Sequence, residues 1–236
     1  MKRFSDGYKA LVIGSSGSIG AAFVRDLQVD EHCEKVTSLS RSEVNEYQLT
    51  IDLKDEVSVQ FAAHTLQLDG PFDLILVATG VLHGDDFMPE KRLADLDIKA
   101  MQETFSVNTL GPALLLKYFL PLLSNAGVMG LISAKVGSIG DNRLGGWYTY
   151  RASKAALNML IKTASIELKR QKPEAIVVAI HPGTVISELS KPFAGGSGSK
   201  ARDANIASQE ILQVLDKLKP EQSGGFFAYD GQELPW

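Results

Sequence analysis

Short apolar runs alternate along the chain with longer stretches in which apolar residues recur every three or four positions. The short runs predict buried strands of a parallel sheet, because strands covered on both faces are apolar nearly throughout. The longer stretches have the spacing of amphipathic helices. The predicted strands span residues 8–13, 35–39, 47–51, 72–77, 128–132, 175–180 and 226–229. The predicted helices span residues 19–27, 57–68, 98–107, 113–123, 148–169 and 204–218.

This alternation predicts an α/β fold, a single-domain, Rossmann-type, doubly wound parallel sheet of about seven strands with helices on both faces. The chain has no internal repeat and no domain boundary, so one domain is expected over residues 1–236. In such sheets ligands bind beyond the carboxyl ends of the strands. Residues 195–199 form a glycine and serine patch, and the segment 187–202 around it is expected to be a mobile loop that covers the substrate.

Composition narrows the classes of function. A formal charge of −4 gives no overall attraction to nucleic acid or to an anionic membrane, and no apolar stretch is long enough to span a bilayer. Cys33 is the only cysteine and the four histidines are scattered, so neither a disulfide nor a metal site is expected. With no apolar segment of a signal peptide near the start, a cytoplasmic protein is expected.

The stretch around Tyr150 and Lys154 opens the longest predicted helix. The two residues stand four apart, which places both side chains on one helix face. An ammonium beside a phenol stabilises the phenolate, so the lysine is expected to lower the pKa of the tyrosine and to make it a proton donor and acceptor. Taken alone, the pair also fits an ordinary solvated helix face, and its context must decide.

A glycine-rich turn, Gly14 to Gly20, follows the first predicted strand. Glycines and small hydroxyl residues there let backbone N–H groups approach a pyrophosphate at the start of the next helix. The alternative is a plain tight turn. No Gly-Lys-Ser/Thr follows, which excludes the phosphate loop of nucleotide-hydrolysing proteins.

The ends of the next two predicted strands bear on the choice of cofactor. An NAD site favours an acidic residue after the second strand, whereas Arg41 stands there and could pair with a 2′-phosphate. NADP(H) is therefore favoured over NAD(H), although Arg41 could also be a solvated loop cation. Asp52 could accept a hydrogen bond from an adenine amino group with Leu53 against the ring, or it could cap the following helix.

These features, together with Asn108 and the Pro182-Gly183 pair, resemble the short-chain dehydrogenase/reductase family, and its sniffer-like and C-factor-like carbonyl reductases most. The resemblance covers nearly the whole chain. It implies an oxidoreductase that transfers a hydride between a nicotinamide and a carbonyl or alcohol substrate. Tyr150 would exchange the proton, Lys154 would bind the nicotinamide ribose and lower the tyrosine pKa, and Asn108 would complete a proton relay.

The resemblance also implies a set of cofactor contacts, although two details depart from the family pattern. Ser18 replaces the middle glycine of the turn, and the residues before Gly80 lack the asparagines that the family has there. The residues expected to contact the cofactor are Gly14, Ser16, Gly17, Ser18, Ile19, Gly20, Arg41, Asp52, Leu53, Gly80, Tyr150, Lys154, Pro182, Gly183, Val185 and Ser187.

The family's catalytic serine is the point of greatest departure. Alignment on Gly137 places Ala134 at the serine position, with Ser133 one residue earlier and Ser138 directly after the glycine. Ser133 is the preferred candidate, but one step along an extended chain turns a side chain to the opposite face, so it could serve only if the loop leaves strand geometry. His181, directly before Pro182, is interpreted as a satisfied structural residue.

Two alternatives to an enzyme of this family stay open. Ala134 also fits a cofactor-binding regulatory or cell-signalling protein of the C-factor-like kind, with little or no turnover. A methyltransferase on a similar sheet is disfavoured, because the second strand ends in Ser40-Arg41 without an acidic residue.

The substrate and the assembly are defined only in outline. Five residues could form an apolar wall that favours a small or aromatic carbonyl, with ordinary packing as an equal alternative: Leu144, Trp147, Tyr148, Leu189 and Phe193. Family members often pair through their long helices, so a homodimer or homotetramer is expected, with no nucleic-acid or membrane partner.

Overall fold

The computed structural model describes residues 1–42, 49–193 and 201–236, and these are built around one parallel sheet. Its strands run in the order β2-β1-β3-β4-β5-β6. From β1 the chain continues outward to β2, and from β3 it continues outward in the opposite direction to β4, β5 and β6. The boundary between β1 and β3 is therefore the switch point at which open α/β sheets bind ligands. The strands are β1 (Tyr8–Ile13), β2 (Cys33–Leu39), β3 (Phe72–Val77), β4 (Leu123–Ile132), β5 (Ile176–His181) and β6 (Phe226–Ala228).

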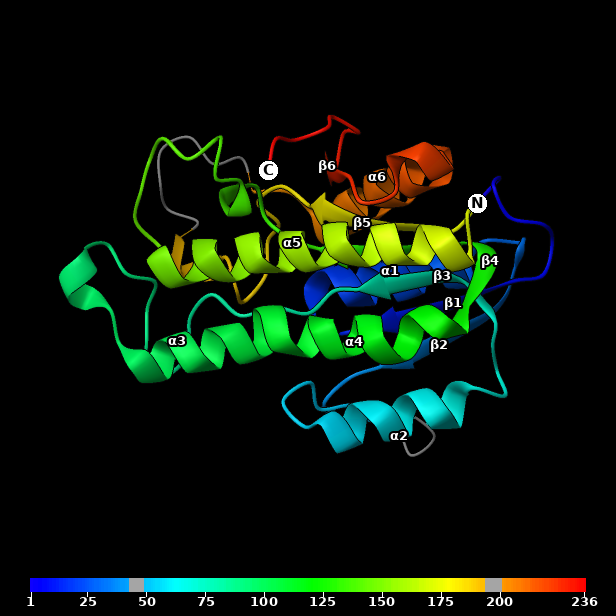
Figure 1. The fold of residues 1–236 in the computed structure, drawn as a ribbon, viewed down its shortest axis with the longest axis horizontal. Coiled ribbons are helices and arrows are strands. Elements are labelled where there is room, and N and C mark those ends of the chain that lie inside the picture. The colour runs from blue at the N-terminus through cyan, green and yellow to red at the C-terminus, as the bar shows by residue number, and fades with distance from the viewer. Residues whose placement is uncertain (43–48, 194–200) are drawn as a thin grey trace.

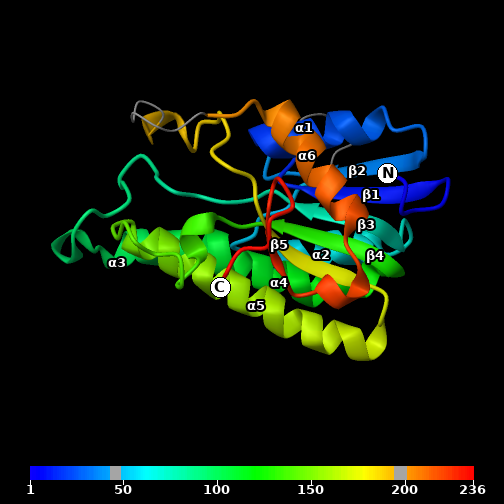
Figure 2. The same cartoon turned by 90° about the horizontal axis from the view of Figure 1, so that it is seen from above.

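Helices cover both faces of the sheet (Figure 1). Figure 2 shows α1 and α6 on one side, with α4 and α5 on the other. The helix α2 packs against α4. The six helices are α1 (Ser18–Gln28), α2 (Glu56–Leu66), α3 (Ile98–Phe105), α4 (Gly111–Phe119), α5 (Tyr148–Gln171) and α6 (Ala204–Lys217) among the described residues.

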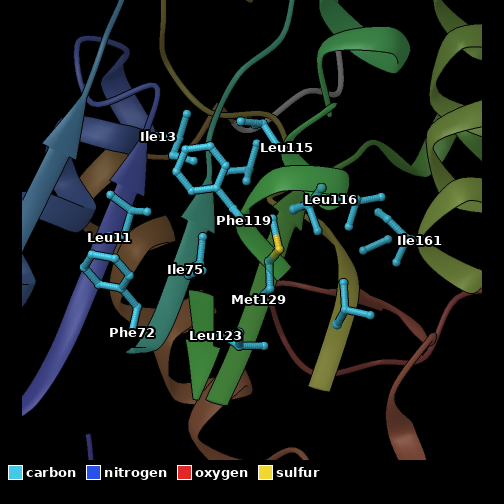
Figure 3. Close-up of a cluster of buried hydrophobic side chains, with 14 of the residues drawn as sticks. Leu11, Ile13, Phe72, Ile75, Leu115, Leu116, Phe119, Leu123, Met129 and Ile161 are labelled. Atoms are coloured by element: carbon cyan, nitrogen blue, oxygen red, sulfur yellow. The ribbon is translucent and has the colours of Figure 1, made fainter. Parts of the chain in front are cut away.

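Each face of the sheet carries its own hydrophobic core, as the alternation of side chains along a strand requires. In β1, Leu11 and Ile13 join the core beneath α2, α4 and α5, whereas Ala10 and Val12 join the core beneath α1 and α6. Figure 3 shows the first of these cores, in which Phe119 of α4 packs among aliphatic side chains from the strands. The strands are thus apolar on both sides, in agreement with the pattern in the sequence.

One of the seven predicted strands is wrong. Residues 47 and 48 of the segment 47–51 lie outside the described residues, and Thr50 makes only an isolated parallel bridge to Ser40. The apolar residue Ile51 is nevertheless buried. Among the described residues, no second pair extends this bridge into a ladder. The other six predicted strands and all six helices are confirmed, with shifts at their ends.

No described helix is long and apolar enough to cross a membrane. No described group of three or more His, Cys, Asp or Glu residues is arranged to hold a metal ion.

We predict that Phe119→Ala lowers the free energy of unfolding by about 3–5 kcal/mol, because the fully buried ring leaves a cavity in a close-packed core. The matched control is Phe61→Ala on α2, whose side chain is 62% exposed and whose loss should cost less than about 1 kcal/mol. Denaturant unfolding measures both. Equal effects of the two substitutions would contradict the assignment of the core.

Candidate active site

Two adjoining cavities lie at the carboxyl ends of the strands. The larger has a volume of about 440 Å³ and the smaller about 240 Å³. The larger extends to residues that follow β4 and β5, and the smaller extends to residues that follow β2. They therefore form one elongated groove across the switch point of the sheet. The residues that line both cavities are Ser16, Gly17, Ala78, Thr79 and Gly80.

The glycine-rich turn forms the middle of this groove. Gly14 has a φ of +91°, and a Cβ there would lie 2.9 Å from the backbone of Ala78, so only glycine fits. Gly17 is the N-cap of α1 and provides no side-chain cap, which leaves the first N–H groups of the helix for a ligand. Gly20 lines neither cavity, and its lack of a Cβ serves packing against Gly14 instead.

Tyr150 and Lys154 lie in the first two turns of α5 and are only 9% and 2% exposed, which rules out a solvated helix face. The Lys154 Nζ donates to the Ile132 carbonyl at 3.1 Å and lies 6.0 Å from the centre of the Tyr150 ring. Burial lowers the pKa of Lys154 to about 8 and raises the pKa of the Tyr150 hydroxyl. The expected lowering of the tyrosine pKa is not seen, because burial disfavours the charged phenolate.

Asn108 lies in a π-helical turn, Ser106–Leu110, that joins α3 to α4. Such turns widen the helix locally and are frequent at functional sites. Its Oδ1 accepts from the Val81 N–H at 2.8 Å, and its Nδ2 donates to the Val81 carbonyl at 2.8 Å and to the Ser153 Oγ at 3.1 Å. Asn108 therefore ties the loop after β3 to α5, while its part in a proton relay stays a prediction.

The two candidate serines differ in position. Ser133 lines the larger cavity, but its hydroxyl donates to Asn158 Oδ1 at 2.6 Å. Ser138 is buried outside the lining and accepts from the Asp141 N–H. Ala134 lines the cavity at the position where the family's serine is expected. The polarising role of either serine therefore stays a prediction.

His181 at the end of β5 also lines the larger cavity. Its Nδ1 is buried and has no hydrogen-bond partner among the described residues, so the interpretation as a satisfied structural residue is wrong. Burial lowers the pKa of the imidazole to about 4, and the nearby Lys135 adds a smaller effect in the same direction.

The smaller cavity brings together Arg41, Asp52 and Leu53, as a cofactor site would require. Asp52 does not cap α2, because the side chain of Asp55 accepts from the Val57 N–H at 2.9 Å. The remaining predicted cofactor contacts all lie on the larger cavity, namely Ser18, Ile19, Pro182, Gly183, Val185 and Ser187.

The predicted covering segment begins on the cavity wall. Among its described residues, Leu189 lines the larger cavity. Ile186, directly before the segment, donates its N–H to the carbonyl of Arg202, the last residue of the segment. Residues 194–200, including the glycine and serine patch, lie outside the described residues, so the mobility of the segment stays a prediction.

Three of the five residues of the expected apolar wall, Trp147, Leu189 and Phe193, line the cavity. The rings of Trp147 and Phe193 lie 5.1 Å apart. Leu144 is 92% exposed, and Tyr148 lies outside the lining, so the expectation is wrong for these two. Both residues flank the turn formed by Gly145, Gly146 and Trp147.

This turn is held by a buried carboxylate that sequence reasoning missed. Gly145, Gly146 and Trp147 are consecutive left-handed residues, and the Trp147 N–H donates to the Glu90 carbonyl at 2.5 Å. The side chain of Glu90 accepts from the N–H and hydroxyl of Thr149. Glu90 thus supplies the cap that α5 otherwise lacks, directly beside Tyr150. No local pattern could reveal a contact across 59 positions.

Comparison with known proteins gives a consistent result. A family model described as short chain dehydrogenase matches residues 8–195. The chain is 33% identical over 187 residues to a 1-hydroxy-2-glutathionyl-2-methyl-3-butene dehydrogenase from Rhodococcus sp. (strain AD45), covering 79% of this chain and 78% of the relative. It is 38% identical over 147 residues to C-signal of Myxococcus xanthus, covering 61% of this chain and 83% of the relative.

Solved structures agree on the fold. The NADPH-bound carbonyl reductase from chicken fatty liver has a TM-score of 0.84 at 24% identity, covering 99% of this chain and 96% of that one. The carbonyl reductase Sniffer of D. melanogaster has a TM-score of 0.83 at 25% identity, covering 98% and 100% of the two chains.

We predict that Glu90→Ala lowers the free energy of unfolding by about 1–3 kcal/mol, because the substitution leaves the N–H and hydroxyl of Thr149 buried without an acceptor. Glu174→Ala, at an exposed glutamate, is the control and should change stability little. Chemical unfolding measures the free energy of unfolding of both variants. A Glu90 variant as stable as the control would show that the carboxylate does not hold α5.

Proposed function

The chain belongs to the short-chain dehydrogenase family, and we propose that it is an NADP(H)-dependent carbonyl reductase or alcohol dehydrogenase. Members of this family are oxidoreductases, and a nicotinamide cofactor is common to them. The observation that carries the proposal is the single groove in which the glycine-rich turn, Tyr150 and Lys154 meet.

The residues around the groove fit a dinucleotide. The uncapped start of α1 offers N–H groups to a pyrophosphate. Thr79, which lines both cavities, has a buried Oγ1 without a partner among the described residues, as expected of a group that meets a ligand. Ser16 to Ile19 would hold the pyrophosphate of a bound dinucleotide, Gly80 would lie at its adenosine ribose, and Pro182 to Val185 with Ser187 would hold the nicotinamide.

The bound nicotinamide supplies the hydride that ends on the substrate carbonyl carbon. Tyr150 gives its hydroxyl proton to the carbonyl oxygen, which becomes the alcohol. Lys154 binds the ribose hydroxyls, and its charged form favours the deprotonated tyrosine that the transfer leaves behind. Asn108 fixes the loop after β3 beside Lys154, since a Cβ at Gly80 would lie 3.4 Å from the Lys154 Nζ and 3.5 Å from the Asn108 Oδ1.

The apolar wall favours an uncharged carbonyl. Trp147, Leu189 and Phe193 face the cavity beside Tyr150, and burying an unpaired charge against them would cost several kcal/mol, on the order given for ions in apolar sites. A small or aromatic aldehyde or ketone fits these walls better than a sugar phosphate.

A regulatory protein with little turnover is the second candidate function. Its support is Ala134 together with the similarity to C-signal. The buried Tyr150 and Lys154 argue against it, because a cofactor-binding regulator has no need for a desolvated amine beside a phenol. A methyltransferase is no longer a candidate, given the family.

We predict that Tyr150→Phe lowers kcat for NADPH-dependent reduction of a panel of aldehydes and ketones by about 100- to 10,000-fold, because the proton donor is lost. Affinity for NADPH should persist. Tyr148→Phe is the matched control, since this tyrosine lies two positions away and outside the cavity lining. Tight binding of NADPH by the wild type without its oxidation would favour the regulatory function instead.

The preference for NADP(H) is attributed to Arg41. Arg41 lines the smaller cavity together with residues of the glycine-rich turn, and its guanidinium would pair with a 2′-phosphate bound there. We predict that Arg41→Ala weakens NADPH binding by about 10- to 100-fold, the equivalent of one charge-assisted hydrogen bond. Fluorescence titration measures the affinity, and NADH is the internal control because it lacks the phosphate. An equal loss for both cofactors would contradict this role.

Assembly and location complete the proposal. A homodimer or homotetramer fits the exposed apolar residues Met159 and Ile166 on α5, which are 66% and 53% exposed, and Leu110 in the π-helical turn, which is 58% exposed. The acidic composition and the single cysteine fit the cytoplasm. A single domain over residues 1–236 agrees with the groove, because residues that follow strands from both halves of the sheet line it.

A further inference from the structure

Ala134 lines the larger cavity at the position where the family resemblance implies a catalytic serine, so a hydroxyl is missing there. The neighbouring Ser133 donates its hydroxyl proton to Asn158 Oδ1 at 2.6 Å. Ser138 lies outside the lining. A carbonyl oxygen that gains charge during reduction needs a hydrogen-bond donor besides Tyr150, because removal of such a donor slows related reactions by orders of magnitude.

His181 occupies the neighbouring position on the same wall. The strands β4 and β5 pair Ile132 with Ile180, and the Ser133 N–H donates to the Ile180 carbonyl at 2.7 Å. The next residues, Ser133 and His181, therefore stand side by side at the carboxyl ends of the two strands. Both line the cavity that Ala134, Tyr150 and Lys154 also line.

The two ring nitrogens of His181 are in different surroundings. Nδ1 is buried without a hydrogen-bond partner among the described residues, whereas Nε2 is not one of the buried unpartnered atoms. A buried N–H without an acceptor is rarer in proteins than a buried acceptor without a donor. The neutral ring is therefore better accommodated with its proton on Nε2, and this N–H is the group left to meet a ligand in the cavity.

The charges around the ring keep it neutral. Burial disfavours the imidazolium, Lys135 and Arg202 add repulsion, and Asp230 offsets only part of it. A neutral imidazole cannot deliver a second proton at neutral pH, but its N–H can still donate a hydrogen bond.

We propose that the Nε2–H of His181 donates a hydrogen bond to the substrate carbonyl oxygen and so performs the polarising role of the serine that Ala134 replaces. This role rests on the proposed function. In the reduction, the hydride goes to the carbonyl carbon, the carbonyl π electrons go to oxygen, the Tyr150 proton joins that oxygen, and the nicotinamide is left oxidised. His181 keeps its proton throughout.

Three variants test the role in the full chain, with para-nitrobenzaldehyde and NADPH as the probe. His181→Leu should lower kcat on the order of 10- to 1000-fold, because the donor is lost, with NADPH affinity unchanged. His181→Gln should retain most of the activity, since the glutamine amide can carry an N–H to nearly the same place. The double variant His181→Leu with Ala134→Ser should recover at least about tenfold in kcat, because it restores a hydroxyl. His64→Leu on α2 is the matched control.

The outcomes separate the two proposals. If the wild type reduces the probe, Tyr150→Phe abolishes turnover and His181→Leu is fully active, the role of His181 is wrong and the proposed function stands. Failure of Ala134→Ser to rescue His181→Leu also overturns the role, because it indicates structural damage. If the wild type binds NADPH but reduces no carbonyl, both proposals fail.

A spectroscopic measurement on the wild type needs no turnover. Long-range proton–nitrogen NMR correlations report the tautomer of each histidine, and comparison with His181→Gln assigns the signal of His181. We expect a neutral ring with the proton on Nε2 at neutral pH. A ring protonated on Nδ1, or charged, would overturn the role even if His181→Leu fails to fold.

Discussion

The burial of Lys154 is the constraint on which the site depends. An ammonium that is 2% exposed must be offset by nearby dipoles, and the structure provides the Ile132 carbonyl at 3.1 Å. Glycines create the space it needs, because a Cβ at Gly137 would lie 2.8 Å from the Lys154 Cβ and one at Gly80 would lie 3.4 Å from its Nζ. The end of β4, the loop after β3 and the start of α5 are therefore fixed relative to one another around a single amine.

This arrangement sets the charges of the site before any ligand binds. Desolvation pushes the amine toward its neutral form and the phenol of Tyr150 toward its protonated form. A protonated phenol is the form that a reductase requires, since it must give a proton to the carbonyl oxygen. The same burial keeps His181 neutral. Without a ligand, the site thus holds a proton on Tyr150.

The periodicity of apolar residues was sufficient to predict most of the fold, because strands covered on both faces and amphipathic helices carry strong local patterns. The prediction of a strand at 47–51 was wrong. Ile51 is buried, as a strand residue would be, but among the described residues Thr50 forms only a single isolated bridge. The groove was predictable from motifs at strand ends, as the shared lining of Gly17, Arg41 and Asp52 illustrates. These positions follow from topology alone.

The side-chain partners were not predictable in this way. Glu90 meets Thr149, and Ser133 meets Asn158, across many positions. The interpretation of His181 failed for the same reason, because the absence of a partner at Nδ1 depends on the packing of several elements. Local patterns carry no information on such contacts, which form only when distant segments pack.

The most direct test of the central claim is the pKa of Lys154 in the protein without ligand. NMR titration of isotope-labelled lysine, with Lys154→Met to assign the signal, measures it. We expect a pKa of about 8, well below the ordinary value of 10.5, because burial disfavours the ammonium. A pKa near 10.5 would mean that the amine is solvated, and it would contradict the buried pair on which the proposed chemistry rests.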